Sequence, residues 1–245
     1  MLQWFSQGNF SVRLEWSLSA VEHLAATVDC VVIVDVMSFS TCVSIAVSHG
    51  AYIYPYPWKD ASAIEYARSL NANTASLDRR LSGEGYSLSP TSLRKITKGE
   101  KLVLPSPNGS AASFKARDAG VAVLSGCFRN MSATANACRS FSRVLVVPCG
   151  ERWHDGSLRP CIEDYVAAGA IITAMGRADC SPEAQAAMAT WNYYRQHNLA
   201  PLRDCASALE LIQRGFNEDV DLCLEIDQSN QECRLRDNAY VPTLT

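Results

Sequence analysis

Short apolar runs, each followed by a polar loop and then by a segment with helical character, recur along the chain. The clearest runs predict strands at 30–36, 102–104, 121–124 and 144–147. Because these runs contain few polar residues, the strands are expected to be buried on both faces. Helices are predicted at 42–49, 111–119, 131–141 and 163–175. Strands that recur about every 20 residues with helices between them indicate an α/β fold with a mainly parallel sheet.

The rest of the pattern is less regular. Further strands are predicted at 12–16 and 52–56, helices at 19–26, 61–70, 182–196 and 206–214, and a helix end and a final strand between 221 and 241. The segment 76–101 predicts a long loop with one helical turn, and loops of that length tend to be functional or mobile. No linker divides the chain, so residues 1–245 are predicted to form one domain.

The composition is that of a folded protein, with 48% hydrophobic and 19% charged residues and a net charge of −3. Nucleic acid is not expected as a partner because there is no basic surface. No apolar run approaches the roughly 20 residues that span a bilayer, and residues 1–9 lack the pattern of a signal peptide. A cytoplasmic protein without membrane contact is therefore expected. Its oligomeric state is open, a homo-oligomer included.

Ten cysteines and four histidines are dispersed along the chain without a Cys-x-x-Cys pair. This spacing indicates neither a disulfide framework nor a zinc site. Any metal is therefore expected to be a hard ion bound by oxygen.

The stretch 143–164 places many chemically useful side chains directly after a buried strand. They are Cys149, Glu151, Arg159, Glu163 and Asp164. Open α/β folds bind ligands at the carboxyl edge of the sheet, so this loop is a candidate site, although a solvated turn explains it too. Glu163 and Asp164 also suit a helix N-terminus without any function. No Cys-x₅-Arg arrangement begins at Cys149, so a tyrosine-phosphatase mechanism is unsupported, and Cys149 is either a packing residue or a nucleophile.

Asp35 ends an otherwise apolar strand, where a carboxylate is costly unless it is solvated, paired or bound to a cation. It is a candidate magnesium ligand or nucleophile. The alternative is an Asp that caps the following turn, whose hydroxyl residues are Ser38, Ser40 and Thr41. Met37 stands where the haloacid-dehalogenase motif needs a second Asp, so that family is rejected.

Two loops have the composition of anion-binding sites, since small and amide residues precede a helix N-terminus that favours negative charge. The first contains Ser106, Asn108, Gly109 and Ser110, and the second contains Cys127, Arg129 and Asn130. The guanidinium of Arg129 suits phosphate or sulfonate. Plain capped loops, with a surface salt bridge for Arg129, explain the same residues.

Together, four blocks resemble the ComB family, the magnesium-dependent 2-phosphosulfolactate phosphatases of coenzyme M biosynthesis. They are DVMSFSTC at 35–42, SPNGS at 106–110, GCFRN at 126–130, and PCGERW with LRPCIED within 148–164. The C-terminal ALELIQRGFNEDVDLCLEID is also similar. The resemblance implies one three-layer α/β/α domain, Mg²⁺ dependence and hydrolysis of a phosphate ester on a small sulfonated or carboxylated acid. One segment departs from the family, because 83–90 is GEGYSLSP in place of a GFDLGNSP-like sequence.

These features predict a Mg²⁺-dependent phosphatase that converts 2-phosphosulfolactate to sulfolactate and phosphate. Mg²⁺ is expected on Asp35, Glu163 and Asp164. The attacking group is open between metal-activated water, Asp35 and Cys149, with Glu151 as general acid or base. The predicted substrate-binding residues are Ser38, Ser40, Thr41, Ser106, Asn108, Gly109, Ser110, Cys127, Arg129, Asn130 and Arg159. The alternatives are a phosphatase for another small phosphorylated acid and a non-catalytic binder of anionic metabolites.

Overall fold

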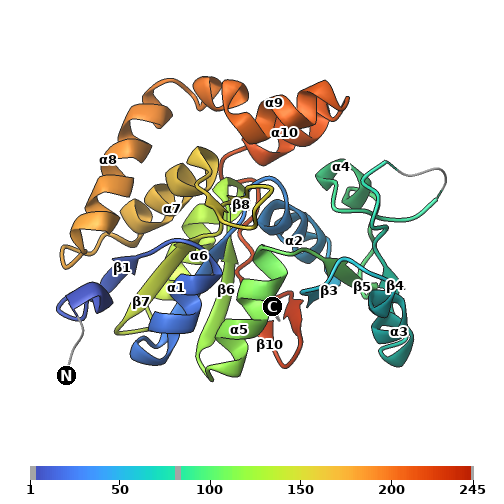
Figure 1. Ribbon diagram of the computed structural model, residues 1–245, viewed down its shortest axis with the longest axis horizontal. Helices are drawn as coiled ribbons and strands as arrows, with labels where there is room; N and C mark the ends of the chain where they lie inside the picture. The colour runs from blue at the N-terminus through green and yellow to red at the C-terminus, as the bar shows by residue number, and fades with distance from the viewer. Residues whose placement is uncertain (1–3, 81–83, 244–245) are drawn as a thin grey trace.

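The computed structural model describes residues 4–80 and 84–243, which form an α/β fold (Figure 1). Within these residues, nine strands form one sheet in the order β1-β7-β2-β6-β10-β11-β3-β5-β4, and β8 and β9 form a separate pair. The strands are β1 (Val12–Leu14), β2 (Cys30–Val34), β3 (Tyr52–Tyr56), β4 (Asn73–Thr74), β5 (Lys101–Pro105), β6 (Ala122–Gly126), β7 (Val144–Pro148), β8 (Glu151–Arg152), β9 (Leu158–Arg159), β10 (Cys233–Arg236) and β11 (Ala239–Val241). The α-helices are α1 (Ser17–Leu24), α2 (Phe39–Ser48), α3 (Ser62–Ser69), α4 (Pro90–Leu93), α5 (Gly109–Asp118), α6 (Met131–Cys138), α7 (Ile162–Met175), α8 (Pro182–Gln196), α9 (Ala206–Gln213) and α10 (Asn217–Cys223). Short 3₁₀ helices lie at Trp4–Ser6, Ala25–Thr27, Phe128–Asn130 and Ala200–Asp204.

The sheet is mainly parallel, as the sequence pattern predicts. β1, β7, β2 and β6 are parallel neighbours, and β3, β5 and β4 form a second parallel set. The hairpin of β10 and β11 pairs antiparallel with β6 and with β3, and so joins the two sets. The final strand predicted from the sequence is therefore two strands, which turn at Asp237 with a φ of 54°.

Helices cover both faces of the sheet, which explains why the central strands are apolar throughout. Along β2, Val31 and Ile33 belong to the core beneath α1, α2 and α5, whereas Val32 and Val34 belong to the core beneath α6, α7 and α8. These two cores confirm the three-layer α/β/α architecture (Figure 1). Among the residues described, no helix has the length and apolarity needed to cross a membrane.

Two local predictions are wrong. The turn expected at 38–41 is mostly the first turn of α2, which begins at Phe39. The strand expected at 12–16 stops at Leu14, and α1 begins at Ser17. The long loop at 76–101 contains one helical turn, α4, as expected. Of the segment 83–90 that departs from the family, Gly83 lies outside the described residues.

Candidate active site

A cavity of about 170 Å³ lies where the loops after β2, β5 and β7 meet. It is formed at the carboxyl ends of strands, the usual place for a ligand in an open α/β fold. Six residues predicted from the sequence line it, namely Asp35, Ser38, Ser106, Asn108, Glu151 and Arg159. The structure therefore brings together three stretches of chain that the sequence marked separately.

A second cavity, of about 350 Å³, shares Asn108 and Glu151 with the first. The Asn108 amide donates a hydrogen bond of 2.9 Å to Glu151 Oε1 at this shared boundary. Cys149 lines the second cavity, and Asp35 lines only the first. We place the candidate site in the smaller cavity, because it contains the buried carboxylate and the larger number of charged groups.

Asp35 is held at the end of β2 by backbone amides. Its Oδ2 accepts a hydrogen bond of 2.9 Å from Gly109 N, and its Oδ1 accepts one of 3.3 Å from Phe39 N. Burial raises the pKa of Asp35 to about 7, and the negative charge of Glu151 contributes further. Because each carboxylate oxygen has two lone pairs, Asp35 keeps acceptor capacity toward the cavity.

Asp164 joins the loops after β2 and β7. Its Oδ1 accepts from Val36 N at 2.7 Å and its Oδ2 from Gly150 N at 2.9 Å, so the first turn of α7 holds both loops in place. Burial, followed by the charge of Glu163, raises the pKa of Asp164 well above its ordinary value. Glu163 is only 2% exposed and accepts a weak hydrogen bond of 3.4 Å from the Cys205 thiol.

These three carboxylates form a buried acidic cluster without a basic partner. None of the ion pairs within residues 4–80 and 84–243 includes Asp35, Glu163 or Asp164. The same residues contain no group of three or more His, Cys, Asp or Glu side chains arranged to hold a metal ion. The cluster is therefore not a preformed cage. A cation that is bound by one or two carboxylates together with water, as Mg²⁺ is, would offset buried negative charge of this kind.

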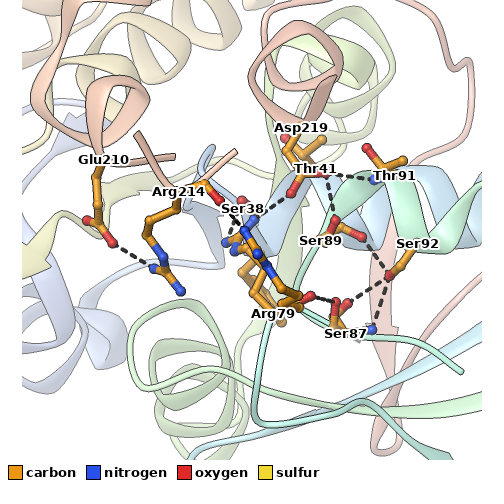
Figure 2. Close-up of polar contacts among 12 residues, drawn as sticks. Ser38, Thr41, Arg79, Ser87, Ser89, Thr91, Ser92, Glu210, Arg214 and Asp219 are labelled. Atoms are coloured by element: carbon orange, nitrogen blue, oxygen red, sulfur yellow. Dashed lines mark hydrogen bonds and ion pairs between the residues drawn. The ribbon is translucent and has the colours of Figure 1, made fainter. Parts of the chain in front are cut away.

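Several basic side chains face the same cavity, and sequence reasoning missed most of them. Besides the predicted Arg159, the cavity is lined by Lys59, Arg79 and Arg214. Arg79 donates to Asp219 Oδ2 at 2.8 Å and to Ser38 Oγ at 3.0 Å (Figure 2). The only sequence signal was the long loop that carries Arg79, since its partners are far away in the chain.

Seven predicted substrate-binding residues lie outside the cavity and contact the backbone or a neighbouring side chain of the protein instead. Ser40 Oγ donates to Ile33 O and Ser110 Oγ to Leu104 O, and both residues are fully buried. The full set is Ser40, Thr41, Gly109, Ser110, Cys127, Arg129 and Asn130, none of which lines the cavity. Thr41 donates to Val36 O, Gly109 N to Asp35, and Asn130 caps the turn at Cys127 N. Arg129 forms an ion pair with Glu225.

Cys149 has the environment of a packing residue. It is 5% exposed, and burial, followed by the charge of Asp35, raises the pKa of its thiol well above the ordinary value. Since the thiolate is the nucleophile, a thiol that holds its proton is poorly reactive. This environment favours the packing interpretation that the sequence left open.

The fold and the cavity define an α/β protein whose carboxyl-edge site combines buried carboxylates with arginines, a combination suited to small anionic ligands. The chain belongs to the 2-phosphosulpholactate phosphatase family, whose model matches residues 18–237. A relative from Synechococcus sp. is 27% identical over 215 residues, which cover 82% of this chain and 84% of the relative. A relative from Caldanaerobacter subterraneus is 24% identical and covers 81% and 84% of the two chains. Both carry the name "Probable 2-phosphosulfolactate phosphatase".

Proposed function

We propose that this protein hydrolyses the phosphate ester of 2-phosphosulfolactate to sulfolactate and inorganic phosphate. The observation that supports the proposal best is the presence of both charges in one cavity. Its lining includes the carboxylates Asp35, Glu151 and Glu210 and the arginines Arg79, Arg159 and Arg214. A small substrate with a phosphate and further acid groups needs both, because a cation between carboxylates and phosphate removes their repulsion. Membership of the family supports the same reaction.

The proposed reaction forms a bond between a water oxygen and phosphorus and breaks the bond between phosphorus and the ester oxygen. The leaving oxygen gains a proton and becomes the hydroxyl of sulfolactate. Glu151 is our candidate for the group that moves this proton, because it lines the cavity and its Oε1 is fixed by Asn108 and by Arg152 N at 2.8 Å. We propose water as the attacking group, since the Cys149 thiol is protonated and outside this cavity.

Asp35, which lines the cavity, would hold Mg²⁺ with help from Glu163 or Asp164, whose negative charges interact with its own. When bound, the ion would neutralise charge on the phosphoryl oxygens. Asp164 positions the loop after β2 that carries Asp35, and Gly109 fixes the carboxylate of Asp35 directly.

Phosphate release from 2-phosphosulfolactate, from 2-phospholactate and from phenyl phosphate, each with Mg²⁺ and with EDTA, tests the proposal. Magnesium-dependent release with preference for the sulfonated ester is the expected result. Faster release from another phosphorylated acid would support the same reaction on a different substrate. Tight binding of these esters without release would support an anion-binding protein in place of an enzyme.

A further inference from the structure

Arg79 is held in one orientation by three neighbours. Its Nη1 donates to Asp219 and its Nη2 to Ser38, while the guanidinium carbon lies 5.5 Å from the centre of the Phe216 ring. The backbone is fixed as well, because Ser87 Oγ donates to Arg79 O at 2.9 Å. Figure 2 shows Arg79 between Ser38 and Asp219.

Asp219 is itself fixed from the far side. It is 1% exposed, and its Oδ1 accepts from Ser89 Oγ at 2.7 Å and from Thr91 N at 3.0 Å. An arginine that only neutralised this buried carboxylate would need no access to a cavity. Arg79 nevertheless lines the cavity beside Asp35, and two bonds use only part of the five N–H donors of a guanidinium. The other donors have no acceptor in the described part of the chain.

Basic side chains line the cavity together with the carboxylates of Asp35, Glu151 and Glu210. The charges that act most strongly on Asp35 are the negative charges of Glu151 and Glu163. Three arginines line the cavity. Arg214 is paired with Glu210 at 2.9 Å and Arg159 lies 5.9 Å from the centre of the Trp153 ring, whereas Arg79 is anchored by a buried carboxylate. Arg79 therefore offers an anchored guanidinium to an anion bound in this cavity.

We infer that Arg79, positioned by Asp219 and Ser38, binds an acid group that stays on the substrate when the phosphate leaves. This group is a sulfonate or a carboxylate. The inference rests on the proposed function and names the part of the site that recognises the substrate. The planar fork of a guanidinium donates two parallel hydrogen bonds to such a group, and a lysine ammonium does not. Asp219 is a positioning residue in this arrangement.

Steady-state kinetics of Arg79→Gln on the three esters tests the inference. We expect KM for 2-phosphosulfolactate to rise about 10- to 100-fold, the value of one hydrogen bond to a charged group, with a smaller change in kcat. Phenyl phosphate, which has no second acid group, should be unaffected. If KM for 2-phospholactate is unchanged, Arg79 binds the sulfonate, which this ester lacks. If KM for 2-phospholactate rises equally, Arg79 binds the carboxylate, which both esters have. Equal losses on all three esters would overturn the inference, because Arg79 would then act on the phosphate.

Two further variants separate recognition from folding. Arg80→Gln is the matched control, since Arg80 also faces Phe216, at 5.9 Å, but is exposed and does not line this cavity. It should leave all three KM values unchanged. Arg79→Gln leaves the buried carboxylate of Asp219 unpaired. In Arg79→Gln/Asp219→Asn a neutral amide replaces that carboxylate, so the double variant should recover stability while KM stays high. Recovery of KM in the double variant would overturn the inference.

Calorimetric binding of sulfolactate gives a readout that needs no turnover. If the unaltered protein hydrolyses none of the esters, the proposed function fails, and this titration alone decides the role of Arg79. Binding that is about 10- to 100-fold weaker in Arg79→Gln than in Arg80→Gln supports the inference. Equal affinities, or no binding to the unaltered protein, overturn it.

Discussion

Gly109→Ala is the most direct test of how Asp35 is held in place. Gly109 begins α5, and its N–H donates to Asp35 Oδ2. A Cβ at this position would lie 2.2 Å from Phe39 Cδ1, 2.7 Å from Phe39 Cγ and 2.9 Å from Asp35 Oδ2. Phe39 is fully buried and packs edge-on against the ring of Tyr240, so it has no free space to move into.

The expected cost has two parts. Overpacking of a filled core costs about 1–3 kcal/mol, and a distorted hydrogen bond adds about 0.5–1.5 kcal/mol. A loss of about 2–4 kcal/mol lowers Tm by about 5–15 °C in a domain of this size. Displacement of Asp35 by about 1 Å should also reduce kcat/KM about 100-fold.

Gly169→Ala provides the matched control for stability. Gly169 lies in α7, where a Cβ would come within 2.0 Å of the backbone oxygen of Ala187 in α8, away from the cavity. Thermal unfolding and phosphate release at a temperature where both variants are folded should separate the two. We expect Gly169→Ala to lose stability and keep its activity, and Gly109→Ala to lose both. Unaltered Tm and activity in Gly109→Ala would show that the Phe39 ring gives way and that Asp35 does not depend on this contact.

Three further predictions concern charge at the site. Asp35→Asn should lower kcat at least about 1,000-fold while the protein stays folded by circular dichroism; retained turnover would remove Asp35 from the mechanism. Cys149→Ser should keep activity within about threefold. In the unaltered protein the Cys149 thiol should resist iodoacetamide, because its raised pKa keeps it protonated. In EDTA, the pKa of Asp35 is about 7 in the folded state and ordinary in the unfolded state, so the folded state binds the extra proton. Stability should therefore fall as pH rises from about 4 to about 7, and added Mg²⁺ should raise Tm more at pH 8 than at pH 5; a flat Tm profile that Mg²⁺ does not change would contradict the acidic site.

The sheet and one half of the site could be predicted from sequence because their signals are local. β2 and β7 are short apolar runs, and Asp35 is conspicuous as a carboxylate at the end of such a run. The loops that follow parallel strands meet at one edge, so Asn108 and Glu151 were expected near Asp35.

The other half depends on contacts between distant parts of the chain. Arg79 and Asp219 are 140 residues apart, and nothing near either one indicates the other. The hydroxyl groups of Ser40 and Thr41 were predicted to bind substrate, but Ser40 donates to the backbone of β2 and Thr41 to that of the loop after it, because a buried hydroxyl needs a partner. Whether a polar side chain near a strand end faces inward or outward is decided by tertiary packing and cannot be determined from composition.

Two residues of the segment that departs from the family pattern affect the cavity, one as part of its lining and the other through the residue that anchors Arg79. Aligning GEGYSLSP with the family's GFDLGNSP places Leu88 opposite the Asn, and Leu88 lines the cavity. An apolar side chain therefore lines the cavity at a position where the family pattern has an amide. Ser89, which is shared with the family pattern, holds Asp219 and through it Arg79. The anchor of the arginine is thus retained while the lining beside it has changed.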